Sequence, residues 1–450
     1  MICLNKIGLE IHASLKTQSK LFCDCPNDKT KDVNINTCPI CLGHPGSKPS
    51  TNKEAVKKTI LVCKALNTGL REDLVFSRKN YFYPDLSKNY QITQYEEPLG
   101  ENGFLEANGK IRIKRVHLEE DPASITREEK NILIDYNRSG TPLVEIVTEP
   151  DIKDSDQARL FMKKLLRTLK YLRVLDENSS LKADVNVSNK KNNYTRVEVK
   201  NVTGFKEIQR CIEYEIKRQE KEKVISETRG WDAMDGETYS MRKKESEADY
   251  GYIYEPDIPI INIKHYLDLE LPILAEEKVK QLTSKGIDND DAEIICDDPD
   301  LVEFFEKSMT SPVFSAKIFR SMILGILNYN KLTISEYPAT PNHIKELLEL
   351  LENKVINEKI AKKILIGLLD KGFSPKEYVK KNNLEMLSDE NISSLVDEVL
   401  KENEGALQDY LNGEEKSLNF LVGMVMKKSK GKANPEQAKS SVLKKIKFLD

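Results

Sequence analysis

Short segments in which apolar and polar residues alternate dominate the chain up to about residue 265. Successive side chains of a β-strand point to opposite faces, so such a segment forms a strand with one apolar and one polar face. In the first of them, Ile7, Leu9 and Ile11 share the apolar face. Glu10 and His12 then point together to the polar face. The pattern predicts a strand that presents an acid and an imidazole side by side.

Two further alternating segments, 181–188 and 195–202, predict a hairpin. The sequence NKKNN follows the first segment and has a composition typical of turns. Antiparallel pairing of two such strands places their polar residues together on one face. These polar residues are Asp184, Asn186, Glu198 and Lys200.

Apolar residues recur at helical spacing in two segments of the same region. In residues 155–173 they include Phe161, Leu165 and Leu169, and residues 204–223 follow a similar pattern. Apolar residues three and four positions apart lie on one side of a helix. We therefore expect two amphipathic helices that cover one side of the sheet.

The pattern changes after about residue 271, where long stretches rich in Glu, Lys, Leu and Ile lack both alternation and Gly-rich turns. This change indicates an all-helical region, and a further shift in composition begins around residue 399. The sequence therefore predicts an α+β protein of three domains. They are a strand-rich domain with covering helices over residues 1–270, a helical domain over residues 271–398 and a small helical tail domain over residues 399–450.

Composition supports several domains and excludes some classes of protein. The 450 residues, 39% of them hydrophobic, exceed the roughly 250–300 residues at which single cores stop growing. The net charge is only -3, which excludes a basic field over the whole surface. No apolar run reaches the roughly 18 residues that span a membrane, and no signal peptide is recognisable, so we expect a cytoplasmic protein. Residues 421–450 stand out, because eight lysines against Glu436 and Asp450 give them a local charge of +6.

The basic tail has the features of a phosphate-binding helix start. Pro435 suits the first position of a helix and Asn434 suits its N-cap. A helix start flanked by lysines would hold an RNA phosphate through free backbone N–H groups and positive charge. The flanking lysines are Lys427, Lys428, Lys430 and Lys432. A solvated lysine-rich helix without a ligand is the alternative.

Four of the eight cysteines form two close pairs, C-x-C and C-x-x-C, with twelve residues between the pairs. They are Cys23, Cys25, Cys38 and Cys41. Each pair can supply two thiolates from one turn, the arrangement that tetrahedral Zn²⁺ requires. We expect a structural zinc site at residues 23–41. Four free thiols in a knuckle that has lost its metal are the alternative.

Carboxylates and imidazoles recur in the first domain in numbers that suit a Mg²⁺ site. Glu10 and His12 face one way on the first strand, and the run HLEED, residues 117–121, follows a later strand. HLEED departs from strict alternation, which leaves open which of Glu119 and Glu120 points inward. Solvated acids on a polar strand face are the alternative. No P-loop and no Gly-rich dinucleotide-binding loop occurs, so a nucleotide would bind elsewhere.

Eleven sequence blocks, in a fixed order, resemble the B subunit of the aspartyl/glutamyl-tRNA(Asn/Gln) amidotransferases almost from end to end. The blocks are GLEIHASLKTQSKLFC, CPICLGHPG, RKNYFYPDLSKNYQITQYEEPLG, HLEED, DYNRSGTPLVEIVTEPDI, ADVNVS, VEVKNVTGF, ETRGWD, GETYSMRKKE, YEPDIP and NFLVGMVMKKSKGKANPE. The order of so many blocks makes the resemblance specific.

The resemblance implies a ligase subunit that acts on misacylated Glu-tRNA(Gln), Asp-tRNA(Asn) or both. ATP would phosphorylate the side-chain carboxylate of the misacylated residue, and ammonia would displace the phosphate. A partner amidase, the A subunit, would release the ammonia from glutamine, and a small C subunit would complete a heterotrimer. The three domains would be a cradle with the kinase site, a helical domain and a tail that contacts the tRNA. The implied cofactors are ATP, Mg²⁺ and a structural Zn²⁺.

The resemblance also implies roles for individual residues. The implied Mg²⁺ ligands are Glu10, His12, Glu119, Glu120 and Glu255. Of these, Glu10, His12, Glu120 and Glu255 form the implied catalytic set. A second tier that would bind the cofactor consists of Arg138, Ser139, Asp184, Asn186, Glu198 and Lys200.

Two departures from the family pattern bear on substrate preference and rate. Pro122, Ala123 and Ser124 follow HLEED, where the family commonly has a lysine as the third residue. Gly251 and Tyr254 lie where an arginine and prolines are usual. The first departure removes a lysine expected beside a phosphate.

Two other functions compete with this one. The related archaeal subunit that acts only on Glu-tRNA(Gln) shares the cradle but carries a large extra domain before the tail, for which this chain is too short. A non-catalytic, zinc-stabilised tRNA-binding protein would have an inactive cradle. The retained Glu10, His12, HLEED and Glu255 argue against it.

Overall fold

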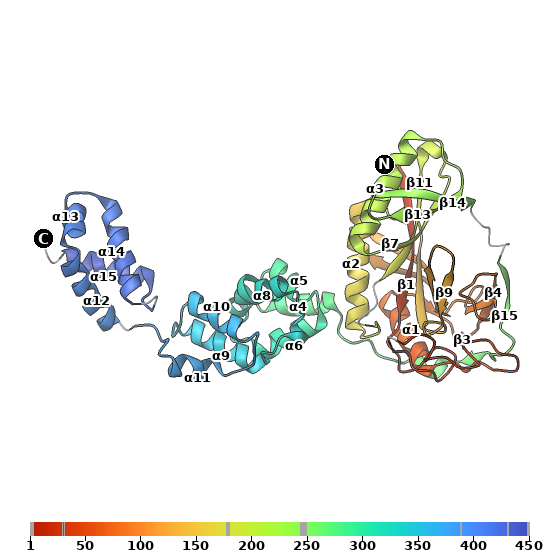
Figure 1. The fold of residues 1–450 in the computed structure, drawn as a ribbon, viewed down its shortest axis with the longest axis horizontal. Coiled ribbons are helices and arrows are strands. Elements are labelled where there is room, and N and C mark those ends of the chain that lie inside the picture. The colour runs from red at the N-terminus through yellow and green to blue at the C-terminus, as the bar shows by residue number, and fades with distance from the viewer. Residues whose placement is uncertain are drawn as a thin grey trace. The chain divides into compact units, whose positions relative to one another are not determined.

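The computed structural model describes residues 4–28, 30, 32–176, 181–243, 250–387, 389–429 and 432–447. The chain divides into two compact units, Met1–Leu274 and Ala275–Asp450 (Figure 1). The described part of the first unit is rich in strands, and that of the second unit is helical. The predicted α+β class is therefore confirmed.

A mixed sheet forms the centre of the first unit. Among the described residues it has nine strands, in the order β14-β13-β12-β11-β1-β10-β7-β6-β2. The strands are β1 (Asn5–Ser14), β2 (Gly69–Leu70), β6 (Gly100–Glu106), β7 (Lys110–Glu120), β10 (Pro142–Thr148), β11 (Lys182–Asn189), β12 (Val197–Thr203), β13 (Glu227–Asp232) and β14 (Glu237–Lys243). Strands β12 and β13 run parallel, and the other neighbours run antiparallel.

Three smaller sheets account for the remaining described strands of this unit. The first has the order β15-β4-β5, with β15 at Gly251–Tyr254, β4 at Ser77–Asn80 and β5 at Tyr90–Thr93. The second pairs β16 (Ile261–Asn262) with β3 (Asp73–Leu74), and the third pairs β8 (Ser124–Arg127) with β9 (Ile132–Asp135).

The helices of the first unit are α1 (Lys53–Ala65), α2 (Ser155–Tyr171) and α3 (Phe205–Lys221), with short 3₁₀ turns η1 (Lys190–Asn192) and η3 (Lys264–Tyr266). Helices α2 and α3 are the two amphipathic helices that the spacing predicts. They pack against each other, and α3 packs on β11 and β12 (Figure 1). Asp154 caps α2, because its side chain accepts a 2.8 Å hydrogen bond from the Gln157 N–H.

Strand β1 has neighbours on both edges and separates a buried face from a polar one. Ile7, Leu9 and Ile11 are at most 1% exposed and belong to the core of the unit. Glu10 and His12 point to the opposite face, as the alternation predicts. Strands β11 and β12 pair antiparallel and form the predicted hairpin. The helices thus cover one face of the sheet, and polar side chains gather on the other.

The second unit consists of helices in its described residues. They are α4 (Ala275–Ser284), α5 (Asn289–Ile295), α6 (Pro299–Ser308), α7 (Pro312–Ile318), a π-helical turn (Phe319–Ile323), α8 (Leu324–Asn330), η5 (Ile334–Glu336), α9 (Pro341–Glu352), α10 (Glu358–Gly367), α11 (Pro375–Lys381), α12 (Asp389–Glu402), α13 (Glu404–Leu411), α14 (Glu415–Lys428) and α15 (Pro435–Lys447). Helix α15 begins at Pro435, and the Asn434 side chain accepts a 2.8 Å hydrogen bond from the Glu436 N–H.

The last helices of the second unit share a core of their own. Ile392, Val396, Leu421, Val425 and Val442 are buried in it. Helix α12 contributes the first two of these residues, and it runs across residue 399, the expected start of the tail domain. None of the described helices combines the length and hydropathy that crossing a bilayer demands.

Candidate active site

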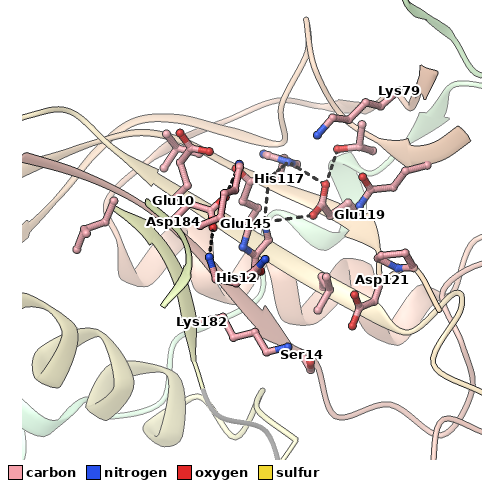
Figure 2. Close-up of a pocket in the computed structure, with 18 of the residues that line it drawn as sticks. Glu10, His12, Ser14, Lys79, His117, Glu119, Asp121, Glu145, Lys182 and Asp184 are labelled. Atoms are coloured by element: carbon pink, nitrogen blue, oxygen red, sulfur yellow. Dashed lines mark hydrogen bonds and ion pairs between the residues drawn. The ribbon is translucent and has the colours of Figure 1, made fainter. Parts of the chain in front are cut away.

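A large cavity opens on the polar face of the nine-stranded sheet (Figure 2). Its volume is about 1590 Å³, and β1, β7, β10, β11 and β12 all contribute to its lining. Strand register places polar residues in rows across the sheet, because directly paired residues point to the same face. His12 pairs with Glu145 on β10, which pairs in turn with His117 on β7. Glu10 pairs with Asp184 on β11.

Three side chains, His12, Glu119 and Glu145, converge in this cavity and are called the histidine cluster below. His12 Nε2 lies 3.6 Å from Glu119 Oε1 and 3.6 Å from Glu145 Oε2. One donor atom from each residue lies within 4.8 Å of the others, a spacing that one metal ion can bridge. Thr93 holds Glu119 in place, since its Oγ1 donates a 2.9 Å hydrogen bond to Glu119 Oε2. Figure 2 shows these side chains facing one another across the cavity.

His117 contacts the histidine cluster and is itself only 2% exposed. Its Nε2 lies 3.0 Å from Glu145 Oε2 and 3.6 Å from Glu119 Oε2. Its Nδ1 is buried without a hydrogen-bond partner. An imidazole that contacts both acids orients them, as the supporting residues of metal sites do.

The imidazoles and acids of this site hold one another in their charged forms. Burial alone would lower the pKa of His12, but the hydrogen bond to Glu145 and the charges of Glu145 and Glu119 raise it to about 10. Burial alone would raise the pKa of Glu145, yet His117 and His12 hold it well below its usual range. The same balance lowers the pKa of Glu119. Both acids are therefore anionic, as metal ligands must be, whereas a cation that binds His12 would have to displace the proton of its imidazole.

A second group of acids lies beside the first, and we call Glu10, Asp184 and Glu198 the Glu10 cluster. One oxygen of each lies within 4.8 Å of the others. Lys200 Nζ lies 2.6 Å from Asp184 Oδ2 and 2.6 Å from Glu198 Oε1. Asn186 Nδ2 donates a 3.0 Å hydrogen bond to Glu10 Oε1. The polar residues of the predicted hairpin thus meet the acid of the first strand.

An irregularity in β12 shapes the Glu10 cluster. One extra residue interrupts the pairing with β11 between Val199 and Val202. Asn201 adopts a left-handed φ of 57° there, and its backbone N–H donates a 2.8 Å hydrogen bond to Asp184 Oδ1. Bulges re-aim side chains next to functional sites, and this one follows directly on Lys200.

The donor set of the histidine cluster fits a divalent cation. Carboxylate oxygens are the ligands that Mg²⁺ and Mn²⁺ prefer, and one imidazole is compatible with such a site. Glu119 and Glu145 are buried, and both approach the same two imidazoles. A cation between them would offset their mutual repulsion. Mg²⁺ keeps part of its water shell and also binds substrate phosphates. The cavity has space for these water and phosphate oxygens.

Glu120, one of the residues predicted to bind Mg²⁺, lies apart from this cavity. Strand β7 continues through Glu120, so alternation turns Glu119 to the cavity and Glu120 to the other side. The Glu120 carboxylate accepts a 2.7 Å hydrogen bond from Lys88 Nζ and a 2.9 Å hydrogen bond from the Ile92 N–H. These partners belong to the neighbouring loop and β5, which explains why the carboxylate is buried.

Glu255 is also kept away from the histidine cluster. Arg78 binds both of its oxygens, each at 2.8 Å, and the carboxylate is fully buried. Of the second tier, Arg138 lines the cavity and lies 3.4 Å from Asp121 Oδ2. Ser139 instead donates a 3.2 Å hydrogen bond to the carbonyl of Cys41, outside the cavity lining.

The four cysteines predicted to bind Zn²⁺ lie together, with their sulfur atoms within 4.8 Å of one another. The Cys38 N–H donates to Cys41 Sγ at 3.2 Å, and Lys20 Nζ lies 3.7 Å from the same sulfur. The hydrogen bond from Cys23, helped by Lys20, lowers the pKa of Cys41 to about 4 against the effect of burial. A set of four sulfur donors around one point fits tetrahedral Zn²⁺.

The lysines predicted to contact RNA differ in their surroundings. Lys427 is exposed, and Lys432 is half-buried. Lys428 forms ion pairs of 3.1 and 2.6 Å with two acids of α12. Lys430 lies outside the described residues.

Sequence reasoning did not single out Glu145. It lies in β10, the segment PLVEIVT, all seven residues of which are buried. Burying a charged side chain is costly unless it is paired. A lone acid in an otherwise apolar strand is therefore the signal that would have identified it.

The residues that line the cavity lie within a region of the chain that matches a known protein family. A family model described as the GatB/GatE catalytic domain matches residues 5–267, and one described as the GatB domain matches residues 300–446. The chain is 40% identical to a protein of Persephonella marina, with 96% of each chain covered, and 40% identical to one of Methanospirillum hungatei, with 98% of each covered. A Thermotoga maritima protein is also 40% identical over 96% of each chain. All three are named as the B subunit of an aspartyl/glutamyl-tRNA(Asn/Gln) amidotransferase.

Proposed function

The chain belongs to the family of B subunits of the aspartyl/glutamyl-tRNA(Asn/Gln) amidotransferases, and on that premise we propose that its cavity is the ATP-dependent activation site of such an enzyme. The substrate is a misacylated Glu-tRNA(Gln), Asp-tRNA(Asn) or both. An oxygen of its side-chain carboxylate attacks the γ-phosphorus of ATP, ADP leaves and an acyl phosphate forms. Ammonia then attacks the acyl carbon, phosphate leaves with the bonding electron pair, and the nitrogen loses a proton to give the amide.

The convergence of His12, Glu119 and Glu145 carries this proposal. Phosphoryl transfer depends mostly on positioning and on stabilising charge. A divalent cation held by these residues would supply positive charge to the phosphate oxygens. Of the two neighbouring glutamates in the implied ligand set, Glu119 is therefore kept in the proposal and Glu120 is not, and Glu145 is added.

The chain also contributes positive charges around two anions, the triphosphate of ATP and the acceptor carboxylate. The acceptor carboxylate is ionised at neutral pH and needs no strong general base. Lys79, Arg138 and Lys182 line the cavity and would attract both the triphosphate and the acceptor. The Glu10 cluster is proposed as a second cation position, where Lys200 pairs with Asp184 and Glu198 when no divalent cation is bound.

The departure at Ser124 has a counterpart in the structure. Ser124 lines a smaller pocket of about 370 Å³ together with Arg138 and Lys182. These two cations border the position at which the family commonly has a lysine. We infer that they supply the charge that Ser124 lacks.

Family membership also suggests partner subunits, a structural metal and a tRNA contact for this chain. The relatives are named as one subunit of a larger enzyme. We propose that an amidase A subunit releases ammonia from glutamine and that a small C subunit joins the assembly. The cysteine knuckle would hold a structural Zn²⁺, and the tail helices would contact the tRNA.

Replacing cluster residues in the assembled enzyme tests the proposal. His12→Ala and Glu145→Gln each remove one ligand, so amidation of Glu-tRNA should fall by at least about 100-fold. The fall should be equal with glutamine and with ammonium chloride as nitrogen donor, while glutamine hydrolysis stays measurable. His265→Ala is the matched control, because His265 is exposed on η3, and it should amidate like the wild type.

Amidation close to the wild-type rate in both variants would remove the histidine cluster from the reaction. A defect seen with glutamine but not with ammonium chloride would assign the two residues to ammonia delivery instead. A wild-type enzyme that binds Glu-tRNA but hydrolyses no ATP in its presence would favour a non-catalytic tRNA-binding protein.

A further inference from the structure

Four tyrosines form one wall of the cavity, and the proposed chemistry does not use them. They are Tyr81, Tyr95, Tyr250 and Tyr252, and all four line the cavity. They lie on or next to the three-stranded sheet β15-β4-β5. We call them the tyrosine wall.

The register of this small sheet explains why the rings share a face. Tyr252 on β15 pairs with Lys79 on β4, and Lys79 pairs with Gln91 on β5. Paired residues point to the same side of a sheet, and so do residues two positions along a strand. Tyr81, two residues after Lys79, and Tyr250, two residues before Tyr252, therefore join the same face. The opposite face carries other residues, among them the Arg78 that binds Glu255.

The rings are arranged as a stack with a cation beside it. Tyr95 and Tyr252 are parallel within 12°, with ring centroids 3.9 Å apart. Tyr250 meets Tyr81 edge to face, with centroids 5.6 Å apart. Lys79 Nζ lies 4.6 Å from the Tyr250 centroid. All four tyrosines are half-buried. Flat, partly exposed rings next to a positive charge are the recurring elements of a nucleobase platform.

The tyrosine wall is linked to the histidine cluster through β5. Thr93, the last residue of β5, donates the 2.9 Å hydrogen bond that holds Glu119. Tyr95 follows Thr93 by two residues. The negative charge of Glu119 also contributes to raising the pKa of Tyr81, after burial and Asp85, which puts Tyr81 within electrostatic reach of the cluster. A ligand with a phosphate at the histidine cluster and a base beyond it would therefore meet the wall.

We propose that the tyrosine wall is a subsite for an adenine base, held by stacking on the tyrosine rings and oriented by Lys79 beside its phosphate chain. This inference rests on the proposed function, because that function brings phosphates to the histidine cluster. Two reaction components carry adenine next to phosphate: ATP, and the terminal adenosine of the tRNA. Both present the π-face of adenine next to negatively charged phosphate, and the experiment separates them.

The first arm compares ATP with ribose 5-triphosphate, which has the phosphates but no base, in the assembled enzyme with Mg²⁺. If ATP supplies the base, the wild type should bind ATP roughly 5- to 100-fold more tightly, the usual range for one stacked base. Tyr95→Leu and Tyr252→Leu should lose most of this preference. Their affinity for ribose 5-triphosphate should stay unchanged, because the histidine cluster is intact.

The second arm compares deacylated tRNA that ends in CCA with the same tRNA lacking the terminal adenosine. If the tRNA supplies the base, the wild type should prefer the complete end by a similar factor, and the leucine variants should not. A preference that occurs in one arm and not in the other identifies the source of the adenine. Tyr95→Phe and Tyr252→Phe keep the rings and should behave like the wild type in both arms.

Tyr254→Leu is the matched control for position, because Tyr254 lies on the same strand, is 57% exposed and does not line the cavity. It should leave both preferences unchanged. A wild type without any preference in either arm overturns the subsite, whatever the variants do. Preferences that survive in both leucine variants also overturn it. If the wild type binds neither ATP nor ribose 5-triphosphate, the proposed function fails, and the tRNA arm alone decides the subsite.

Discussion

At the scale of single residues, the Glu10 cluster depends on one lysine. Burial opposes a charge on Lys200, but Asp184, Glu198 and Glu10 raise its pKa above the usual range. The ammonium group lies 2.6 Å from two of these acids. Removing one partner of a buried ion pair costs more than the pair contributes, because the remaining charge is left without a partner.

Lys200→Met should therefore destabilise the protein in metal-free buffer by about 3 kcal/mol. Added Mn²⁺ should raise the melting temperature of this variant more than that of the wild type, because a cation can replace the ammonium group. Calorimetry with and without Mn²⁺ measures both effects. Lys206→Met, at an exposed position of α3, should melt like the wild type. An equal gain from Mn²⁺ in variant and wild type would contradict a cation position at the Glu10 cluster.

At the scale of elements, β7 assigns different roles to two neighbouring acids. Its alternation continues to Glu120, so Glu119 faces the histidine cluster while Glu120 pairs with Lys88. Lys88 and Glu120 are both largely buried, with side chains 10% and 6% exposed. One acid should matter to catalysis and the other to stability.

Glu119→Gln should lower amidation of Glu-tRNA by at least about 100-fold, because it removes a proposed metal ligand. Glu120→Gln should instead lower the free energy of unfolding by roughly 3 kcal/mol and keep activity at temperatures where the protein is folded. Amidation rates at low temperature and calorimetric melting of both variants provide the measurement, and each variant is the control for the other. The reverse order of effects would return Glu120 to the ligand set.

Alternation predicted the faces of β1, β11 and β12 correctly, because side-chain direction along a strand is a local property. In HLEED the polar residues do not alternate strictly with apolar ones, so the sequence alone left open whether Glu119 or Glu120 points inward. The structure shows β7 running to Glu120, which makes the alternation continuous through the motif. Helices α2 and α3 were equally accessible to prediction, because their apolar spacing is repeated over several turns.

At the scale of the whole molecule, the tail helices form a core that begins earlier than composition suggests. Ile392 and Val396 of α12 belong to that core, so a cut at residue 399 would divide it. The Met386 N–H bonds to the Val355 carbonyl, whereas the Leu387 N–H bonds to that of Lys432. A truncation after Met386 therefore removes the tail core as a unit.

This truncation should weaken tRNA binding by the assembled enzyme and reduce its salt dependence, since it removes the lysine-rich end of the chain. Filter binding of tRNA at several salt concentrations gives both quantities. The melting of the first unit should be unchanged, which controls for general damage. An unchanged affinity and an unchanged salt slope would reject a role of the tail in tRNA binding.

The cysteine knuckle joins parts of the first unit that lie far apart in sequence. The Cys41 carbonyl accepts a 2.7 Å hydrogen bond from Ser87 and a 3.2 Å hydrogen bond from Ser139. Elemental analysis should find about one zinc per chain. Cys38→Ser should lower both the zinc content and the melting temperature, whereas Cys63→Ser, in the core of the unit, should keep the zinc. Folded wild-type protein without metal would reject the site.

The sequence by itself determined the polar and apolar faces of the strands, the amphipathic helices and the cysteine pairs, because each of these is encoded in residues close together along the chain. The family resemblance was also visible in the sequence, since it rests on the order of the sequence blocks. The sequence also placed Glu10 and His12 on the polar face of the first strand, and Asp184 and Lys200 on the polar face of the hairpin. These inferences needed no knowledge of which strands become neighbours.

Only the tertiary structure decided which acids meet. His12, Glu119 and Glu145 come from β1, β7 and β10, and the register between these strands makes them neighbours. The tertiary structure also brings Glu120 to Lys88 of a neighbouring loop, and Glu255 to Arg78 on β4 of the three-stranded sheet. The physical reason is that hydrogen bonding between strands sets distances across a sheet, whereas the order of residues sets only the direction in which each side chain points.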